Sequence, residues 1–192
     1  ASQITTSAQP VFQASSTMHS QPALHFDGTD VLNTAATNFD ITDDMTYFIV
    51  LNPEKTEQKS VLGSVDTSNR FGIFFTGPTT LNQPARFHFG GGHLQVTHPD
   101  GTPYPTDVTT MLAGIREGSA QRAYLDGELI GSNTVASVNV TESIFQIGGM
   151  LNGGVPYLEG EIAEVILYNR ALSQAEFDQV SEYLFHKYVP EP

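Results

Sequence analysis

The sequence predicts an all-β domain that ends in a single helix. Short apolar segments alternate with stretches rich in Gly, Ser, Thr, Asn and Pro, and charged residues make up only 15% of the chain. That pattern is typical of many strands joined by turns. The one clear helical pattern lies near the C-terminus, directly after an apolar strand. A length of 192 residues suits one domain, so we expect residues 1–192 to form a single unit.

Residues 1–22 are polar and rich in Ser, Thr and Gln. We expect this segment to form an edge strand or an arm lying across the domain. Each strand that follows is an apolar or alternating run bounded by turn residues. In chain order, these predicted strands cover residues 23–26, 45–51, 60–65, 71–76, 86–89, 93–98, 109–116, 121–125, 128–130, 135–140, 143–147 and 161–168.

The last of these strands, residues 161–168, is apolar on both faces, which is typical of a strand inside a layered structure. Alternate residues of a regular strand share a face, so Glu161 and Glu164 are expected on opposite faces. The same rule gives two apolar sets. One consists of Ala163, Val165 and Leu167, and the other of Ile162, Ile166 and Tyr168.

The helix is predicted over residues 173–187. Ser173 and Glu176 have the spacing of a capping box, in which side chains satisfy the first free amides of a helix. Leu172 and Phe177 have the spacing of a hydrophobic staple across that cap. One apolar face follows at helical spacing, formed by Phe177, Val180, Leu184 and Tyr188.

The chain is strongly acidic, with 21 acidic residues against 8 basic ones and a net charge of −13. Such a surface repels phosphate backbones and anionic lipid heads, which argues against nucleic-acid and membrane-surface roles. No apolar run approaches the ~20 residues needed to cross a bilayer, so no membrane insertion is expected. Cysteine is absent, which excludes disulfides, thiolate metal sites and a cysteine nucleophile.

Several segments match a known family. They are ALHFDG at residues 23–28, followed by Asp30 and Leu32; YLDGEL at 124–129; FQIGG at 145–149; and the closing stretch 160–188. Over roughly residues 20–188 the chain resembles the laminin G-like domains of the concanavalin A-like lectin/glucanase superfamily, in the form common in bacterial extracellular proteins. The resemblance implies a jelly-roll sandwich of two antiparallel sheets, with ligand sites on the concave sheet and on the loops at one end.

Catalysis is not supported by the sequence. Glycanases of this superfamily need two carboxyls flanking one bond, about 5–5.5 Å apart for retention. The nearest pair here is Glu161 with Glu164, which strand parity separates unless a bulge intervenes. Lyases of this architecture use Tyr or His with Arg, and Arg86 and His88 share a strand face, but the signature strings of those lyases are absent. We therefore predict no catalytic residues.

A calcium ion is the one cofactor that the sequence suggests. Asp27 and Asp30 in the FDGTD turn carry the hard oxygen ligands that calcium prefers, and Glu164 is a third candidate. The alternative for the turn is that Asp-Gly forms it without an ion. For Glu164 the alternative is a hydrogen-bonding partner among its apolar neighbours.

Sugar binding needs an apolar platform and planar polar groups. The chain has no Trp, so Tyr104 and Tyr157, both in polar or Gly- and Pro-rich loops, are the candidate platforms. Three loops, residues 66–70, 93–104 and 152–157, are predicted to form the site together. Their candidate hydrogen-bonding residues are Asp66, Asn69, Arg70, His93, His98 and Asn152.

The leading hypothesis is a noncatalytic, lectin-like module of a larger secreted or cell-surface bacterial protein. Its partner would be a glycan or a cell-surface polysaccharide, with adhesion as a related role. A second hypothesis is a structural spacer that contacts neighbouring domains and binds no sugar. A third, a glycanase or lyase acting on polysaccharide, would require Glu161 with Glu164, or Arg86 with His88, to be essential.

Overall fold

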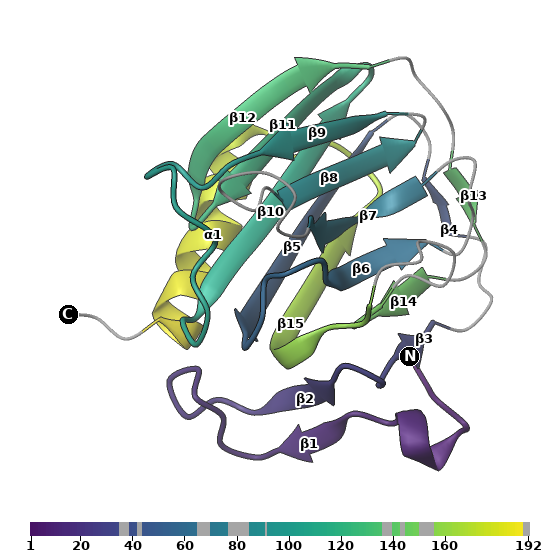
Figure 1. Ribbon diagram of the computed structural model, residues 1–192. Helices are drawn as coiled ribbons and strands as arrows, with labels where there is room; N and C mark the ends of the chain where they lie inside the picture. The colour runs from purple at the N-terminus through teal and green to yellow at the C-terminus, as the bar shows by residue number, and fades with distance from the viewer. Residues whose placement is uncertain are drawn as a thin grey trace.

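Two antiparallel sheets lie face to face in a computed structural model, which describes residues 1–34, 39–41, 44–64, 70–76, 85–90, 92–135, 140–142, 145–149 and 156–189 (Figure 1). The first sheet has the spatial order β1 (Val11–Gln13), β2 (Ala23–Asp27), β15 (Glu159–Tyr168), β5 (Met45–Pro53), β10 (Thr110–Glu117), β11 (Ala120–Leu125) and β12 (Glu128–Thr134). The second has the order β3 (Leu32–Asn33), β14 (Phe145–Ile147), β6 (Ser60–Ser64), β7 (Arg70–Phe75), β8 (Ala85–Gly90) and β9 (His93–Val96). Outside these sheets are the 3-10 turn Thr6–Ala8, the strand pair β13 (Val140–Glu142) and β4 (Phe39–Ile41), and the helix α1 (Gln174–Tyr188).

This arrangement confirms the predicted jelly-roll sandwich of two antiparallel sheets with one C-terminal helix. Within the described residues, the polar N-terminal segment contributes β1, which pairs with β2 at the edge of the seven-stranded sheet. No helix in the described part of the chain is both long and apolar enough to cross a membrane.

The main core fills the space between the sheets. The buried Tyr47 ring of β5 meets the rings of Phe71 and Phe89 from the opposite sheet, with centroids 5.2 and 5.3 Å away. Gly114 on the neighbouring β10 makes room for them, because a Cβ there would lie only 2.5 Å from the Tyr47 ring. The aromatic packing therefore depends on a glycine in the middle of a strand.

A second core lies on the other face of the seven-stranded sheet, under α1. Phe177 of the helix stacks on Phe48 of β5 and contacts Tyr124 of β11. The predicted cap is confirmed, since the Ser173 hydroxyl accepts from the Glu176 amide while the Glu176 carboxylate accepts from the Ser173 amide. The helix thus covers the seven-stranded sheet on the side away from the six-stranded sheet.

The predicted parity of β15 is wrong at its start. A bulge at Ala163 shifts the register with β5, so that Ile162 pairs with Leu51 while Glu164 pairs with Val50. As a result Ile162 joins the core between the sheets and Ala163 packs on the helix side. The expected faces hold beyond the bulge, with Val165 and Leu167 toward the inner core and Ile166 and Tyr168 toward the helix.

Candidate functional site

The structure describes only part of the predicted glycan-binding group. Asp66, Asn69 and Asn152 lie outside the described residues, and Arg70 is placed only as a backbone position at the start of β7. Tyr157 is partly exposed, and its backbone forms a parallel bridge with Ser60 at the start of β6. These residues are therefore not brought into a single described site.

The Tyr104 platform is not supported, because its side chain lies in the inner core. Only 2% of Tyr104 is exposed, and its ring contacts the rings of Phe75 and His98, each with a centroid 5.5 Å away. Burial raises the pKa of its hydroxyl well above the usual value. Because the ring packs among apolar side chains, neither of its faces is accessible to a sugar.

The backbone around Tyr104 nevertheless forms one wall of a cavity of ≈ 410 Å³ between two loops, residues 54–57 and 103–106. The Thr56 hydroxyl donates to the Tyr104 carbonyl at 3.2 Å, and the Asp107 amide donates to the Pro53 carbonyl at 2.8 Å. These two bonds connect the segments on either side of the cavity. Sequence patterns did not reveal it, since its walls come from segments about 50 residues apart.

His93 lies on a surface that we name the β8–β9 face, on the outer side of the six-stranded sheet, where the buried rings of Phe74 and His88 lie beside Arg86, His93 and Gln95. Strand register places these side chains together, since Phe74 pairs with Arg86, His88 with His93, and Arg86 with Gln95. The rings of Phe74, His88 and His93 stack in sequence, with centroids 4.9 and 5.2 Å apart. His93 and Gln95 are exposed at the surface. Gln95 was missed by sequence reasoning.

Arg86 is held in a fixed orientation on this face. Its Nε donates to the Gln95 side-chain oxygen at 2.9 Å, and its guanidinium carbon lies 5.8 Å from the centroid of the Phe74 ring. Within the described chain, its two terminal nitrogens have no hydrogen-bond or ion-pair partner. The planar end of the group is therefore open to a ligand that can accept two parallel hydrogen bonds.

The surroundings of His93 favour its neutral form. Partial burial and, secondarily, the nearby Arg86 charge lower the pKa of its imidazole below the usual value of 6.5. The neutral ring has one nitrogen that donates and one that accepts, as hydroxyl recognition requires. The face thus combines one fixed positive charge with planar neutral groups.

The calcium candidates do not converge. The Asp27 carboxylate accepts from the amide and hydroxyl of Thr29 at 2.8 and 2.7 Å, and Asp30 accepts from the Asp27 amide at 3.1 Å. Glu164 accepts instead from Lys187 Nζ and the Tyr188 hydroxyl, at 2.8 and 2.7 Å. Among the described residues, no three acidic or histidine side chains form a group that could hold a metal. Calcium at Asp27 and Asp30 stays a prediction.

The glycanase pair is also occupied. The bulge at Ala163 places Glu161 and Glu164 on the same, helix-covered face, contrary to the expected separation. Glu161 accepts from the Thr17 hydroxyl at 2.6 Å, far along the chain, while Glu164 is bound by the helix residues described above. Both carboxylates therefore hold structural elements in place.

The sequence profile of the concanavalin A-like lectin/glucanases superfamily, in its laminin G type, matches residues 26–177. The chain belongs to this family. The match confirms the resemblance and includes the strands from β3 to β15 and the beginning of α1. Among curated proteins, no match to this chain was found.

Solved structures share the fold at low identity. Domain 4 of the extracellular arabinanase AbnA from Geobacillus stearothermophilus, in complex with arabinotriose, has 16% identity and a TM-score of 0.70, with 90% of this chain and 81% of that chain covered. A pentraxin from Limulus polyphemus has 12% identity and a TM-score of 0.65, with 82% of this chain and 80% of that chain covered. The CBM40 domain of a Ruminococcus gnavus sialidase, bound to α2,3-sialyllactose, has 14% identity and a TM-score of 0.56, with 78% of this chain and 98% of that chain covered. At these identities the likeness establishes the shared fold.

Proposed function

We propose that this domain is a noncatalytic carbohydrate-binding module that binds an acidic sugar residue through the β8–β9 face. Family membership and the shared fold with two sugar-bound domains support carbohydrate binding. Within that class, the observation that carries the ligand type is the open guanidinium of Arg86. A secreted or cell-surface location in a larger protein is part of the proposal.

The charge of Arg86 is unusual for this chain. Every other Lys or Arg side chain that the structure describes, except Arg116, pairs with an acidic side chain. Arg116 is buried and donates to backbone carbonyls. The acid pairs are Lys55 and Lys59 with Glu159, Arg122 with Glu117, Arg170 with Glu176, and Lys187 with Glu164. Arg86 is thus a cation without a carboxylate on a surface that otherwise repels anions.

A sugar carboxylate fits this arrangement. The terminal nitrogens of Arg86 form a fork that matches the two oxygens of a uronate or sialate. The neutral His93 ring and the Gln95 amide lie beside it and can exchange hydrogen bonds with ring hydroxyls. The net charge of −13 disfavours long polyanions, so a single acidic residue within a mainly neutral glycan suits the domain better.

The experiment compares sialyllactose with lactose, which lacks the acidic residue, and adds digalacturonate as a uronate probe, in calorimetric or NMR titrations. We expect binding of both acidic sugars and weaker or absent binding of lactose. Arg86→Gln should weaken acidic-sugar binding about tenfold, or ~1.4 kcal/mol, as is typical for a hydrogen bond to a charged group. Arg122→Gln is the control, because Arg122 pairs with Glu117 on the other sheet.

The same titrations can contradict the proposal. Equal binding of lactose and sialyllactose, or an Arg86→Gln variant that binds acidic sugars normally, would remove Arg86 as the determinant. No binding to any acidic or neutral glycan would favour the structural spacer instead. Release of shortened or unsaturated products would favour an enzyme. Affinity should stay constant between about pH 7 and 8, where His93 is neutral, and change only on acidification.

A further inference from the structure

One edge of β15 has no strand partner over most of its length. β2 pairs with β15 only from Glu159 to Ile162, whereas β5 pairs with it as far as Tyr168. Along residues 163–168 the backbone groups that face away from β5 make no hydrogen bond within the described chain. Such a row of free amides and carbonyls is a template for another strand.

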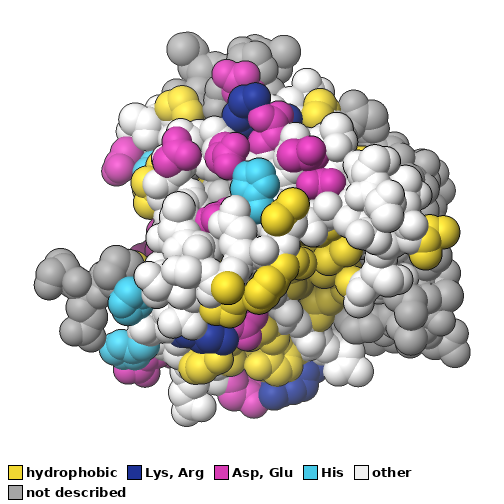
Figure 2. All heavy atoms as spheres, turned by 90° about the horizontal axis from the view of Figure 1, so that it is seen from below, with side chains coloured by type: hydrophobic (Ala, Val, Ile, Leu, Met, Phe, Trp, Pro, Cys, Tyr) yellow, Lys and Arg dark blue, Asp and Glu magenta, His cyan; other side chains and the backbone are white. Residues whose placement is uncertain are grey.

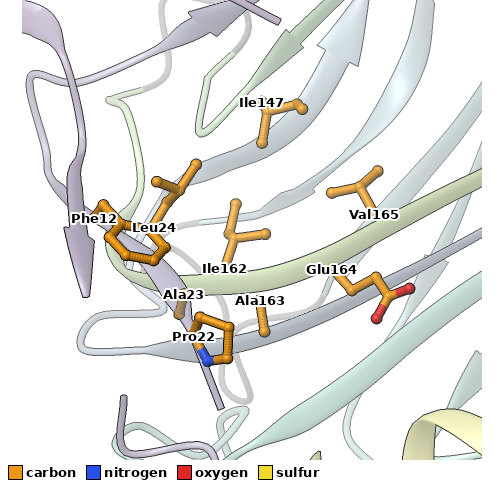
Figure 3. Close-up of a pocket in the computed structure, with 9 residues that line it drawn as sticks. All are labelled: Phe12, Pro22, Ala23, Leu24, Ile147, Ile162, Ala163, Glu164 and Val165. Atoms are coloured by element: carbon orange, nitrogen blue, oxygen red, sulfur yellow. The ribbon is translucent and has the colours of Figure 1, made fainter. Parts of the chain in front are cut away.

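An apolar groove of ≈ 340 Å³ lies at the point where β2 leaves β15 (Figure 3). In Figure 3, Ile162 and Val165 lie on one side of the β15 ribbon, with Leu24 and Ile147 near them, and Glu164 lies on the other side. The side chains of Val165 and Leu167 belong to the inner core but stay partly exposed. The space between the two sheets is therefore open at this edge.

Apart from the bulge at Ala163, the edge has little of the usual protection against strand addition. Natural edges carry lysine, proline or inward charges, whereas residues 163–168 read AEVILY, with one charge in six. The opposite edge strand of the same sheet, β12, is polar by comparison, with Glu128, Ser132, Asn133 and Thr134. A sparsely charged edge is thus found at β15 and not at β12.

We propose that this edge binds an extended basic segment of a partner protein, which adds a strand in the place where β2 ends. In such a strand alternate side chains face opposite sides of the sheet. One set would enter the apolar groove beside Ile162 and Val165, and the other would lie on the outer face, at the acidic surface of the domain. Apolar and basic residues in alternation match those two environments.

Charge selects this occupant over a second copy of the chain. Figure 2, viewed from the β1–β2 side, shows hydrophobic side chains gathered in a hollow and acidic side chains spread over the surface around it. Glu164, which lines the groove, is paired with Lys187, so the attraction rests on the acidic surface as a whole and not on that carboxylate. Two copies of a chain with net charge −13 repel each other, whereas lysine or arginine side chains are attracted.

The test uses a fluorescein-labelled, acetylated and amidated hexapeptide in which lysine and valine alternate. We expect saturable binding by fluorescence anisotropy and slower hydrogen exchange of the amides in residues 163–168. A peptide of the same side chains with alternate backbone amides methylated should not bind, because it cannot complete the ladder of hydrogen bonds. A glutamate–valine peptide should bind much more weakly.

Protein variants give a second, independent check. Val165→Lys places a charge at the groove and should weaken binding by about tenfold or more, while Leu129→Lys on β12 is the matched control at the other edge. A melting curve shows whether the Val165→Lys variant folds. If the variant does not fold, the comparison of methylated and unmethylated peptides on the wild-type chain still tests the proposal. Equal binding of the methylated peptide would overturn strand addition. A dimer that already protects residues 163–168 without peptide would identify a second copy as the occupant and overturn the proposal.

Discussion

Replacement of Phe177 by alanine tests whether α1 is an integral part of the sandwich. The Phe177 side chain is 0% exposed, and its ring lies with centroids 5.0 Å from Phe48 and 4.2 Å from Tyr124. Truncation of a buried phenylalanine costs about 3–5 kcal/mol. Because the ring is completely buried between two aromatic partners, we expect a loss near the middle of that range, ~4 kcal/mol. That is a large part of the ~5–15 kcal/mol typical of a folded domain.

Urea denaturation followed by circular dichroism measures the loss of unfolding free energy. In a separate thermal melt, the melting temperature should fall by roughly 8–16 °C. Tyr183→Ala is the matched control on the same helix, since Tyr183 is 51% exposed and its loss should cost under ~0.5 kcal/mol. At a temperature where Phe177→Ala stays folded, its acidic-sugar affinity should equal that of the wild type, because Arg86 lies on the other sheet. A loss below ~1.5 kcal/mol would refute the reasoning that this ring fixes the helix to the sheet.

Two further predictions concern ionisable groups. Arg170, followed by the Ser173 amide, lowers the pKa of Glu176 to about 2, below the usual 4.5. Its contribution to stability is therefore present above pH 4.5 and lost as the pH falls toward 2, and Glu176→Gln should flatten this part of the melting-temperature profile. At the FDGTD turn, the predicted calcium site requires that calcium raise the melting temperature of the wild type but not of Asp27→Asn or Asp30→Asn. If the wild type has the same melting temperature in calcium and in chelator, the predicted calcium site is wrong.

Local sequence patterns predicted the elements whose cause is itself local. The cap at Ser173 depends on a residue three positions away, and the strands follow alternation over a few residues. The bulge at Ala163 was not predictable, because both faces of β15 are apolar and the extra residue leaves the pattern unchanged. Its consequence is large, since it moves Glu161 onto the same face as Glu164.

Most of the candidate site depends on contacts between distant parts of the chain, which local sequence patterns do not reveal. Tyr104 lies in a polar, Pro-rich loop, which predicts exposure, yet the core beside Phe75 has room for its ring. The pairing of Arg86 with Gln95 depends on strand register across a loop, which alternation does not encode. Sequence reasoning therefore found His93 and Arg86 separately but not the surface that they share with Gln95.

The two proposed surfaces follow from the way the sandwich is covered. The helix α1 occupies the outer face of the seven-stranded sheet, which leaves the β8–β9 face and the β15 edge as exposed surfaces of contrasting character. In a chain with 21 acids and 8 bases, most described cations are neutralised by neighbouring carboxylates, and this contrast is the basis for the acidic-sugar site that we propose at Arg86. The β15 edge combines free backbone groups with the acidic surface of the domain, which is why we propose a basic segment as its partner. On the two proposals together, a glycan and a basic protein segment bind at the same time, because the β8–β9 face and the β15 edge are separate surfaces.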